Sequence, residues 1–190
     1  MPDRIDSISI RLATPDDIPL LTQLIPESVR ALRHGFYTHA QAEAAIRHVF
    51  GVDSQLVADG TYFVAVEGER LVACGGWSWR RTLYGGDQRP MGTGNILDPS
   101  ADAARIRAFF VSGTHARRGI GARLLAACAE AASARGFTRL ELMSTLPGVP
   151  FYGKLGFTEV EPVVDTLPDG TAVGFLRMTR AVQLSGGSLS

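Results

Sequence analysis

The 190 residues suit a single domain, and a hydrophobic content of 45% is enough to fill a substantial core. A formal net charge of zero argues against a surface dedicated to nucleic acid or to an anionic membrane. No apolar run reaches the roughly 18 residues of a membrane span. The polar start of the chain does not resemble a targeting peptide, so we expect a cytoplasmic protein.

The first half of the chain predicts a strand, two helices and a β-hairpin. The segment "SISIRLA" (7–13) alternates apolar and polar residues, as a half-buried strand does. The next segment, "TPDD" (14–17), has the N-cap residue, proline and early acids of a helix start. A second helix is predicted over 39–50, and two β-rich runs joined across "EGE" (67–69) predict the hairpin.

A long loop rich in Gly, Pro, Asp and Arg follows over 80–103, and loops of this length are often functional. Beyond it, "RIRAFFV" (105–111) predicts a strand. A helix is predicted over 119–135, with Gly136 after its end and an inner stripe of Ile120, Leu124, Cys128 and Ala131. The remaining elements are a strand ("TRLELMS"), a short helix near 149–155, a strand near 158–164 and a last strand ("AVGFLRM") after the turn at 168–170.

This order of elements predicts a mixed α/β (α+β) domain rather than the strict alternation of a doubly wound sheet. We expect one domain over residues 1–182. The last residues, 183–190, are rich in Ser and Gly and predict a flexible tail.

The cysteines and histidines predict neither a disulfide nor a metal site. Cys74 and Cys128 lie in apolar segments far apart in the sequence, which favours buried free thiols. The histidines lack the spacing of metal ligands, and no nucleophile-elbow sequence is present. We therefore expect chemistry without a metal and without a covalent enzyme intermediate.

The segment "HARRGIGARLLAAC" (115–128) places two glycines at a helix start, where glycine costs roughly 1 kcal/mol against alanine. A dinucleotide-binding turn would need a third glycine at position 124, which is leucine. A P-loop would need Gly-Lys-Ser/Thr, and this segment has no lysine. Two interpretations remain: a glycine-rich strand-to-helix turn without a ligand, and a cradle for a pyrophosphate.

A pyrophosphate cradle would use successive main-chain N–H groups at the helix start. The helix dipole adds roughly half a positive charge, and the neighbouring arginines, including Arg123, add more. Glycine at positions 119 and 121 would let phosphate oxygens reach the amides without meeting a Cβ. The predicted cradle comprises Arg117, Arg118, Gly119, Ile120, Gly121 and Ala122.

Further along the chain comes "PFYGKLGF" (150–157). A strand, an "RRGIG" helix start, a second strand and an FYxxxGF segment together resemble the GCN5-related N-acetyltransferase (GNAT) superfamily, over nearly the whole domain. The resemblance implies a mixed, mostly antiparallel central sheet flanked by helices, acetyl-CoA as cosubstrate, and no metal. It also implies that the cradle binds the pyrophosphate of acetyl-CoA. The backbone of Phe109, Phe110 and Val111 would bond the pantetheine arm, and Tyr152 would lie near the thioester sulfur.

The chain departs from the family pattern at two positions. The family loop usually begins with Gln or Arg, where this chain has Ala116. Many members carry an Asn that contacts the cofactor, and here that place falls at Thr145. Because much of the cradle is main chain, we expect cofactor binding to survive the change at 116.

The resemblance implies direct attack of the amine on the thioester. Tyr152 is the expected acid that protonates the leaving thiolate, and the alternative is a core tyrosine that orders the loop. A main-chain N–H over 109–111 could polarise the thioester carbonyl. The general base stays open, because 105–111 contains no carboxylate, and the candidates are Glu141, Asp98, Asp102, His34 and His115.

The resemblance places the acceptor amine between the first two helices and later loops, here 30–37 and 75–87. Trp77, Trp79 and the aromatic residues Phe36, Tyr37 and Tyr84 could hold a cationic amine by cation–π contact, or they could pack in the core. Arg33, Arg80 and Arg81 could bind a substrate carboxylate or be solvated.

The predicted function is N-acetyltransfer to a primary amine of a small molecule, with no nucleic-acid or membrane partner, and the resemblance also suggests a homodimer. Two other functions fit the same residues: acetylation of a protein or peptide amine, and a non-catalytic acyl-CoA-binding module. The long loop over 80–103 favours a small acceptor, because such a loop could cover a compact pocket. Indifference to Tyr152→Phe would mark the non-catalytic module.

Overall fold

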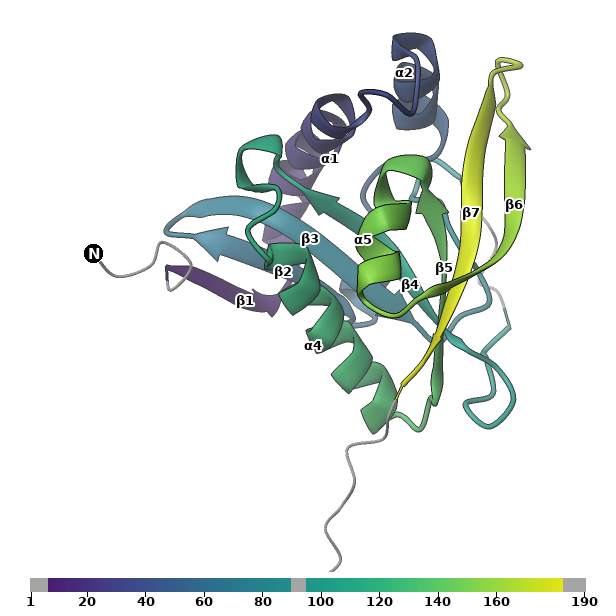
Figure 1. Cartoon of the computed structure of the whole chain (residues 1–190). Helices are drawn as coiled ribbons and strands as arrows, with labels where there is room; N and C mark the ends of the chain where they lie inside the picture. Colours follow the sequence, from purple (N-terminus) through teal and green to yellow (C-terminus); the bar gives the residue numbers. More distant parts are fainter. Residues whose placement is uncertain (1–6, 90–94, 183–190) are drawn as a thin grey trace, which may run out of the picture.

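A computed structural model describes residues 7–89 and 95–182. In this part of the chain a seven-stranded sheet has the order β1-β2-β3-β4-β5-β7-β6 (Figure 1). The neighbouring strands are antiparallel except for β4 and β5, which are parallel. The predicted mixed, mostly antiparallel sheet is therefore confirmed. The strands are β1 (Ile8–Leu12), β2 (Tyr62–Glu67), β3 (Arg70–Ser78), β4 (Ala104–Val111), β5 (Arg139–Thr145), β6 (Thr158–Thr166) and β7 (Ala172–Ala181).

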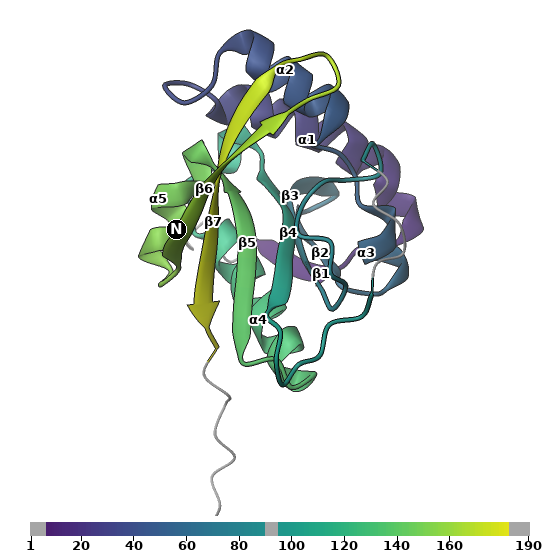
Figure 2. The same ribbon diagram turned by 90° about the vertical axis from the view of Figure 1, so that its right-hand side faces the viewer.

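Helices cover both faces of the sheet (Figure 2). Buried residues of α1 (Ile18–Leu32), α2 (His39–His48) and α3 (Ser54–Ala58) share one core cluster on one face. Residues of α4 (Ile120–Ala134) and α5 (Val149–Lys154) fill the clusters on the other face. The sequence analysis missed α3, because five residues are too few to show a helical period. The predicted tail over 183–190 lies outside the described residues.

The start of α1 is held by a capping box and by an ion pair between the exposed Arg11 and the buried Asp17. Thr14 and Asp17 satisfy each other's backbone N–H groups, and the guanidinium of Arg11 donates to both carboxylate oxygens of Asp17 at 2.7 and 2.8 Å. The hydrogen bonds from Arg11 lower the pKa of Asp17 to about 2. The predicted helix start is thus confirmed, and the charge of Asp17 contributes to its stability.

The helix α4 buries the predicted apolar stripe against the sheet, but the last residue of the stripe differs from the prediction. Ile120, Leu124 and Cys128 are buried, but the stripe continues to Ala132, and Ala131 is only partly buried. Cys128 and Cys74 are both buried and free, so the prediction of unpaired thiols is confirmed. Burial raises the pKa of the Cys74 thiol to about 12, which makes it unreactive.

The parallel strands β4 and β5 separate soon after they begin. They pair at Ala104 with Leu140 and at Arg105 with Glu141, and in the described part of the chain no later residue of β4 pairs with β5. Ala108 has a φ of 54°, and the register of β3 against β4 shifts at the same level. Such a bulge bends its strand and increases its twist. Residues 106–111 of β4 therefore turn away from β5 and leave an opening between the two strands.

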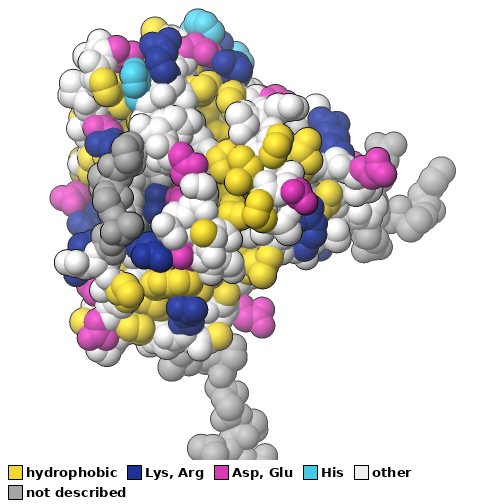
Figure 3. Space-filling model, turned by 180° about the vertical axis from the view of Figure 1, so that it is seen from behind, with side chains coloured by type: hydrophobic (Ala, Val, Ile, Leu, Met, Phe, Trp, Pro, Cys, Tyr) yellow, Lys and Arg dark blue, Asp and Glu magenta, His cyan; other side chains and the backbone are white. Residues whose placement is uncertain are grey.

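The described surface shows no single-sign patch on the face seen from behind (Figure 3). Basic and acidic side chains are interspersed there, as the net charge of zero would suggest. Among the described residues, no helix is both long and apolar enough to cross a membrane.

Candidate functional site

The loop between β4 and α4 leaves the start of α4 open. Arg117 and Gly119 both have left-handed backbone angles, with φ of 63° and 76°. Gly119 is the N-cap residue of α4, and no side chain caps the helix there. The first N–H groups of an α-helix have no partner inside the helix, so an uncapped start can take an anion.

The two glycines of this segment are required for different reasons. A Cβ on Gly119 would meet no atom within 4 Å, but its φ of +76° is strained for residues with a side chain. A Cβ on Gly121 would lie 3.0 Å from Cζ of Phe151 on α5. Gly121 therefore also permits close packing of α4 against α5, which the sequence analysis did not anticipate.

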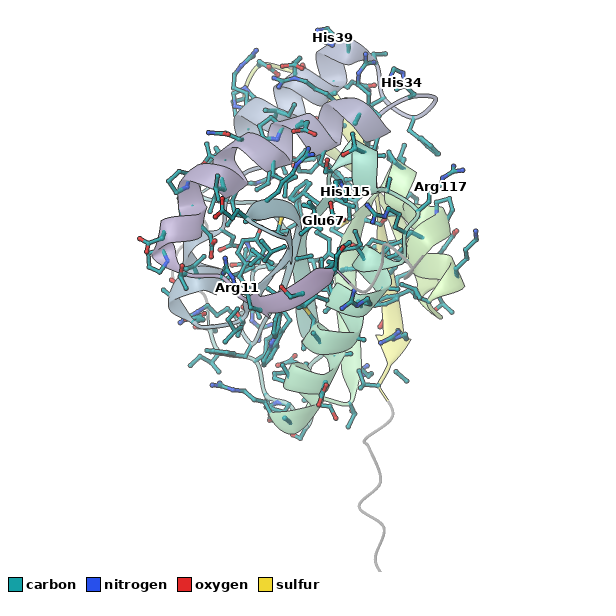
Figure 4. The ribbon with its side chains drawn as sticks, turned by 90° about the vertical axis from the view of Figure 1, so that its left-hand side faces the viewer. Arg11, His34, His39, Glu67, His115 and Arg117 are labelled. Carbon is teal, nitrogen blue, oxygen red and sulfur yellow. The ribbon has the colours of Figure 1, made fainter. Side chains whose placement is uncertain are left out.

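A chain of polar contacts anchors the loop to β2. The buried His115 lies 3.1 Å from a carboxylate oxygen of Glu67, and Arg118 binds the other oxygen of that carboxylate at 3.3 Å (Figure 4). The hydrogen bond with His115, followed by that with Arg118, holds the pKa of Glu67 below its usual value. His115 is thus a structural residue of the loop.

The arginines near the helix start have different partners. Arg118 is paired with Glu67, and Arg123 donates to the carbonyl oxygen of Ile8 at 2.9 Å. Arg117 is exposed. Arg117 is therefore the arginine best placed to meet a ligand arriving from solvent.

The end of β4 has a different environment on each face of the sheet. The ring of Phe109 lies over Gly75, where a Cβ would come within 2.6 Å of it. The ring of Phe110 meets Phe50 edge-on on the other face, at 5.8 Å between centroids. The N–H of Val111 donates to Oγ of Ser28 on α1 at 3.2 Å. A ligand that used the Val111 amide would have to replace this bond.

A pocket of about 600 Å³, open solvent included, lies where β4 and β5 separate, and we call it the β4–β5 pocket. Residues of β4, β5 and α5 and of the loops over 49–51 and 83–86 form its walls. The lining side chains that bear polar or aromatic groups are Phe50, Tyr84, Arg107, Phe109, Phe110, Ser144, Thr145, Tyr152 and Phe175.

Tyr152 lies in the wall of the β4–β5 pocket and is 8% exposed. Its ring packs edge-on against Phe109, Phe151 and Phe157, with centroids 6.4, 4.9 and 5.6 Å away. Within the described part of the chain its hydroxyl group has no hydrogen-bond partner. Burial raises the pKa of Tyr152 well above its ordinary value, so the hydroxyl keeps its proton at neutral pH.

None of the residues considered as general base lines the pocket. Glu141 is buried between Arg105 and Arg177 and forms ion pairs with both. Asp98 and Asp102 bind backbone N–H groups within their own turn. His34 is exposed, and Figure 4 places it away from His115. No Asp, Glu or His side chain of the described residues lines the β4–β5 pocket.

The predicted acceptor residues are only partly brought together. Trp77 is buried beside Phe137 in the core, and Trp79 lies under Arg135, so neither lines the pocket. Tyr84 does line it, with its hydroxyl bonded to Asp165 at 3.2 Å. The arginines Arg33, Arg80 and Arg81 are not part of its lining, and Arg80 is paired with Asp59.

Arg107 on β4 lines the pocket and was missed by the sequence analysis. Its side chain is 7% exposed and forms an ion pair of 2.7 Å with Asp53, the N-cap residue of α3. Burial lowers the pKa of Arg107, and the charge of Asp53 opposes this shift. A signal was available, since an arginine between Ile106 and Ala108 interrupts an apolar strand.

Among the described residues, no group of three or more His, Cys, Asp or Glu side chains could hold a metal ion. The uncapped helix start instead fits an anionic group, because its N–H groups are unpaired within the helix and Arg117 lies beside them.

Comparison with known proteins identifies the family. Residues 26–157 match the family model described as the acetyltransferase (GNAT) family, and the chain belongs to this family. No curated protein matches the sequence.

The fold is shared with solved GNAT structures. A GCN5-related N-acetyltransferase from Rhodopseudomonas palustris is 18% identical with a TM-score of 0.68, over 92% of this chain and 96% of that one. The PaiA N-acetyltransferase from Thermoplasma acidophilum, solved in complex with coenzyme A, is 17% identical with a TM-score of 0.62, over 92% and 99%. The ribosomal-protein-S18-alanine N-acetyltransferase from Escherichia coli is 16% identical with a TM-score of 0.56, over 96% and 99%. At these identities the likeness concerns the fold.

Proposed function

We propose that the protein is an N-acetyltransferase that transfers the acetyl group of acetyl-CoA to a primary amine of a small molecule. The observation that carries this proposal is the contact through Phe151. Its ring lies against Gly121 at the start of α4, where an added Cβ would be 3.0 Å from Cζ, and it packs edge-on against Tyr152 in the β4–β5 pocket, with centroids 4.9 Å apart. One ring thus contacts both the proposed anion site and the proposed acid.

Acetyl-CoA would supply the acetyl group as a thioester. The main-chain N–H groups over 117–122 would hold its pyrophosphate, with Arg117 adding charge from solvent. The backbone of Phe109, Phe110 and Val111 would hold the pantetheine arm along the edge of β4 that β5 leaves open. The PaiA protein, which has the same fold and was solved in complex with coenzyme A, supports coenzyme A as the ligand.

The reaction needs a neutral amine and a proton for the leaving sulfur. The amine nitrogen attacks the thioester carbonyl, so that a C–N bond forms and the C–S bond breaks. Tyr152 donates its hydroxyl proton to the sulfur, and the proton lost by the amine passes to water and restores the phenol. The Tyr152 hydroxyl is protonated at neutral pH, as a proton donor must be, and the rise in its pKa on burial makes it a weaker acid than an exposed tyrosine.

The described lining of the pocket contains no carboxylate that could act as a general base, but the pocket environment itself favours the neutral form of an amine. Arg107 is the one charged side chain that lines the pocket among the described residues. That charge is already paired with Asp53, and no carboxylate of the described lining could pair with an ammonium group, so burial in the pocket disfavours the charged form of the amine and lowers its pKa. Water could then take the proton released during attack.

The acceptor is proposed to be small because the pocket is bounded on several sides. The loop over 83–86 and the loop over 49–51 both contribute to its walls, opposite β4 and β5. A protein amine would need an open groove that admits a backbone on both sides of the reacting residue.

The test of cofactor binding is thermal unfolding of the full chain with acetyl-CoA, free CoA or NAD at equal concentrations. A ligand present at 100 times its Kd adds about 2.7 kcal/mol of stability, which raises the melting temperature by several degrees. We expect this rise with both CoA species and not with NAD.

Thiol release from acetyl-CoA over a panel of small amines, with a lysine-containing peptide for comparison, then tests the reaction. Turnover with small amines supports the proposal, and turnover with the peptide alone points to a protein acceptor. A thermal shift without any turnover points to a non-catalytic module. If neither CoA species shifts the unfolding, the proposal is wrong.

A further inference from the structure

The β4–β5 pocket contains one charge in an otherwise uncharged lining, as far as the described residues show. Apart from Arg107, its walls consist of apolar, aromatic and hydroxyl-bearing side chains and glycines. The guanidinium is 93% buried, which is unusual for arginine without a specific partner. The buried charge of Arg107 therefore needs polar partners in the pocket wall.

Two contacts from different segments orient the guanidinium, and both use Nη2. This nitrogen lies 2.7 Å from Oδ2 of Asp53 and donates to the carbonyl oxygen of Gly85 at 2.6 Å. Asp53 is itself held in place, because its other oxygen accepts the N–H of Leu56 as the N-cap of α3. The side chain of Arg107 is thus positioned by β4, α3 and the loop over 83–86.

The same guanidinium has hydrogen-bonding capacity left over. Arginine carries five N–H donors. Among the described residues Nε has no partner, but it is too deeply buried to meet a ligand, as are the unpaired Nε atoms of Arg33, Arg105 and Arg180. Nη1 also makes no hydrogen bond with a described residue, and it is not among the fully buried atoms. A carboxylate in the pocket could therefore accept a charge-assisted hydrogen bond from Nη1.

We propose that the acetyl acceptor carries a carboxylate that binds Arg107, so that the substrate class is a small amino acid rather than a simple amine or a polyamine. The inference rests on the proposed acetyltransferase function and adds the acceptor class to it. Arg107 and Tyr152 line the same pocket, so one bound acceptor could contact both. A second ammonium group finds no carboxylate in the described lining, so a polyamine is disfavoured.

Simple removal of the arginine is a poor test, because it would strand the buried charge of Asp53. The double variant Asp53→Asn with Arg107→Gln removes both charges and keeps polar groups of similar size. Arg107→Lys is the matched control, because lysine keeps a positive charge opposite Asp53 and strands neither partner of the buried pair. Circular dichroism and the thermal shift with CoA would check that both variants fold.

The probes are L-amino acids and their amides, which differ only in the carboxylate. In the first arm, unfolding of the CoA-saturated protein is followed with each member of a pair. In the second arm, thiol release from acetyl-CoA gives kcat/KM for each member. For the best pair we expect a shift with the acid alone and a preference of at least about tenfold for the acid in kcat/KM. The preference should disappear in the double variant and remain in Arg107→Lys.

The outcomes separate this inference from the function on which it rests. Equal use of acid and amide by the unaltered protein overturns the role of Arg107, and so does a preference that survives in the double variant. An absent CoA shift or an absence of turnover with every amine overturns the proposed function. In that case the first arm is repeated without CoA, and the absence of an acid-specific shift means that Arg107 does not bind a carboxylate.

Discussion

The two ends of the candidate site are built in different ways. At the start of α4 the groups that face a ligand are main-chain N–H groups, set by left-handed backbone at Arg117 and Gly119. In the β4–β5 pocket they are side chains, and those of Arg107, Tyr84 and Tyr152 come from three separate segments. The first end depends on local conformation and the second on tertiary packing.

This difference suggests a division of labour. A main-chain site tolerates changes of side chain, so it suits a donor that is common to a whole family. A side-chain site changes with single substitutions, so it suits an acceptor that differs between members. The departure at Ala116 is compatible with the first point, because the loop keeps an uncapped helix start without the usual side chain.

Tyr152→Phe tests the side-chain end and has the largest expected effect. The kcat of acetyl transfer should fall by about 10²- to 10³-fold, because the leaving thiolate loses its proton donor. The KM for acetyl-CoA should change little, since the hydroxyl has no hydrogen bond to lose within the described residues. Steady-state kinetics at saturating acetyl-CoA would measure both constants.

The control for that variant is Tyr37→Phe. The Tyr37 hydroxyl donates to the carbonyl of Gly174 and accepts from the N–H of Leu146, outside the pocket lining. Its removal should lower the melting temperature and leave kcat of the folded protein unchanged. Equal kinetics for the unaltered protein and Tyr152→Phe would contradict the role of Tyr152 as acid.

Gly119→Asp tests the main-chain end. Aspartate and asparagine adopt left-handed backbone more readily than other residues with a side chain, so the helix should still form at some cost in stability. Its carboxylate would stand where an anion is proposed to bind, and like charges about 4 Å apart repel by several kcal/mol near a protein surface. We expect the affinity for CoA, measured by calorimetry, to fall by roughly 100-fold.

Gly119→Asn is the matched neutral variant. It has the same shape and backbone tolerance, so it should lose much less affinity than the aspartate. If the two variants bind CoA equally well, the helix start is not the anion site, and the contrast between the two ends of the site fails.

Asp17→Asn calibrates the comparison with a side-chain ion pair outside the pocket lining, in which Asp17 is buried and Arg11 is exposed. Because Arg11 lowers the folded-state pKa of Asp17 to about 2 from an ordinary 3.8, the ionised carboxylate stabilises the fold. This stability is complete above about pH 5 and is lost as the pH falls through the folded pKa. Replacement should cost about 2 kcal/mol at pH 7, from chemical denaturation, and much less near pH 2.

The neighbouring exposed Asp16 provides the control, since Asp16→Asn should change the unfolding free energy little. Activity per folded molecule should stay constant in both variants. A loss of kcat in Asp17→Asn would mean that the N-terminal ion pair also shapes the site.

Most of the fold was predictable because local patterns specify it. Alternation in "SISIRLA", the capping pattern of "TPDD" and the apolar stripe that begins at Ile120 each led to an element that the structure contains. The helix α3 was missed because it is short, and Trp77 was left between two interpretations because a strand residue can face either the core or a ligand.

In the candidate site, too, the features set by local sequence were predictable and those set by tertiary contacts were not. The segment "RRGIG" could be recognised from the sequence, because a turn and a helix start depend on neighbouring residues alone. Tyr152 was recognised from the short segment "FYGKLGF" in which it lies. The pairing of Arg107 with Asp53 and the packing of Phe151 on Gly121 join residues that are distant in the sequence. The separation of β4 from β5 likewise follows from the way the two strands twist apart within the sheet. Local conformation is encoded over a few residues and could be read from them, whereas these contacts exist only after the sheet has formed.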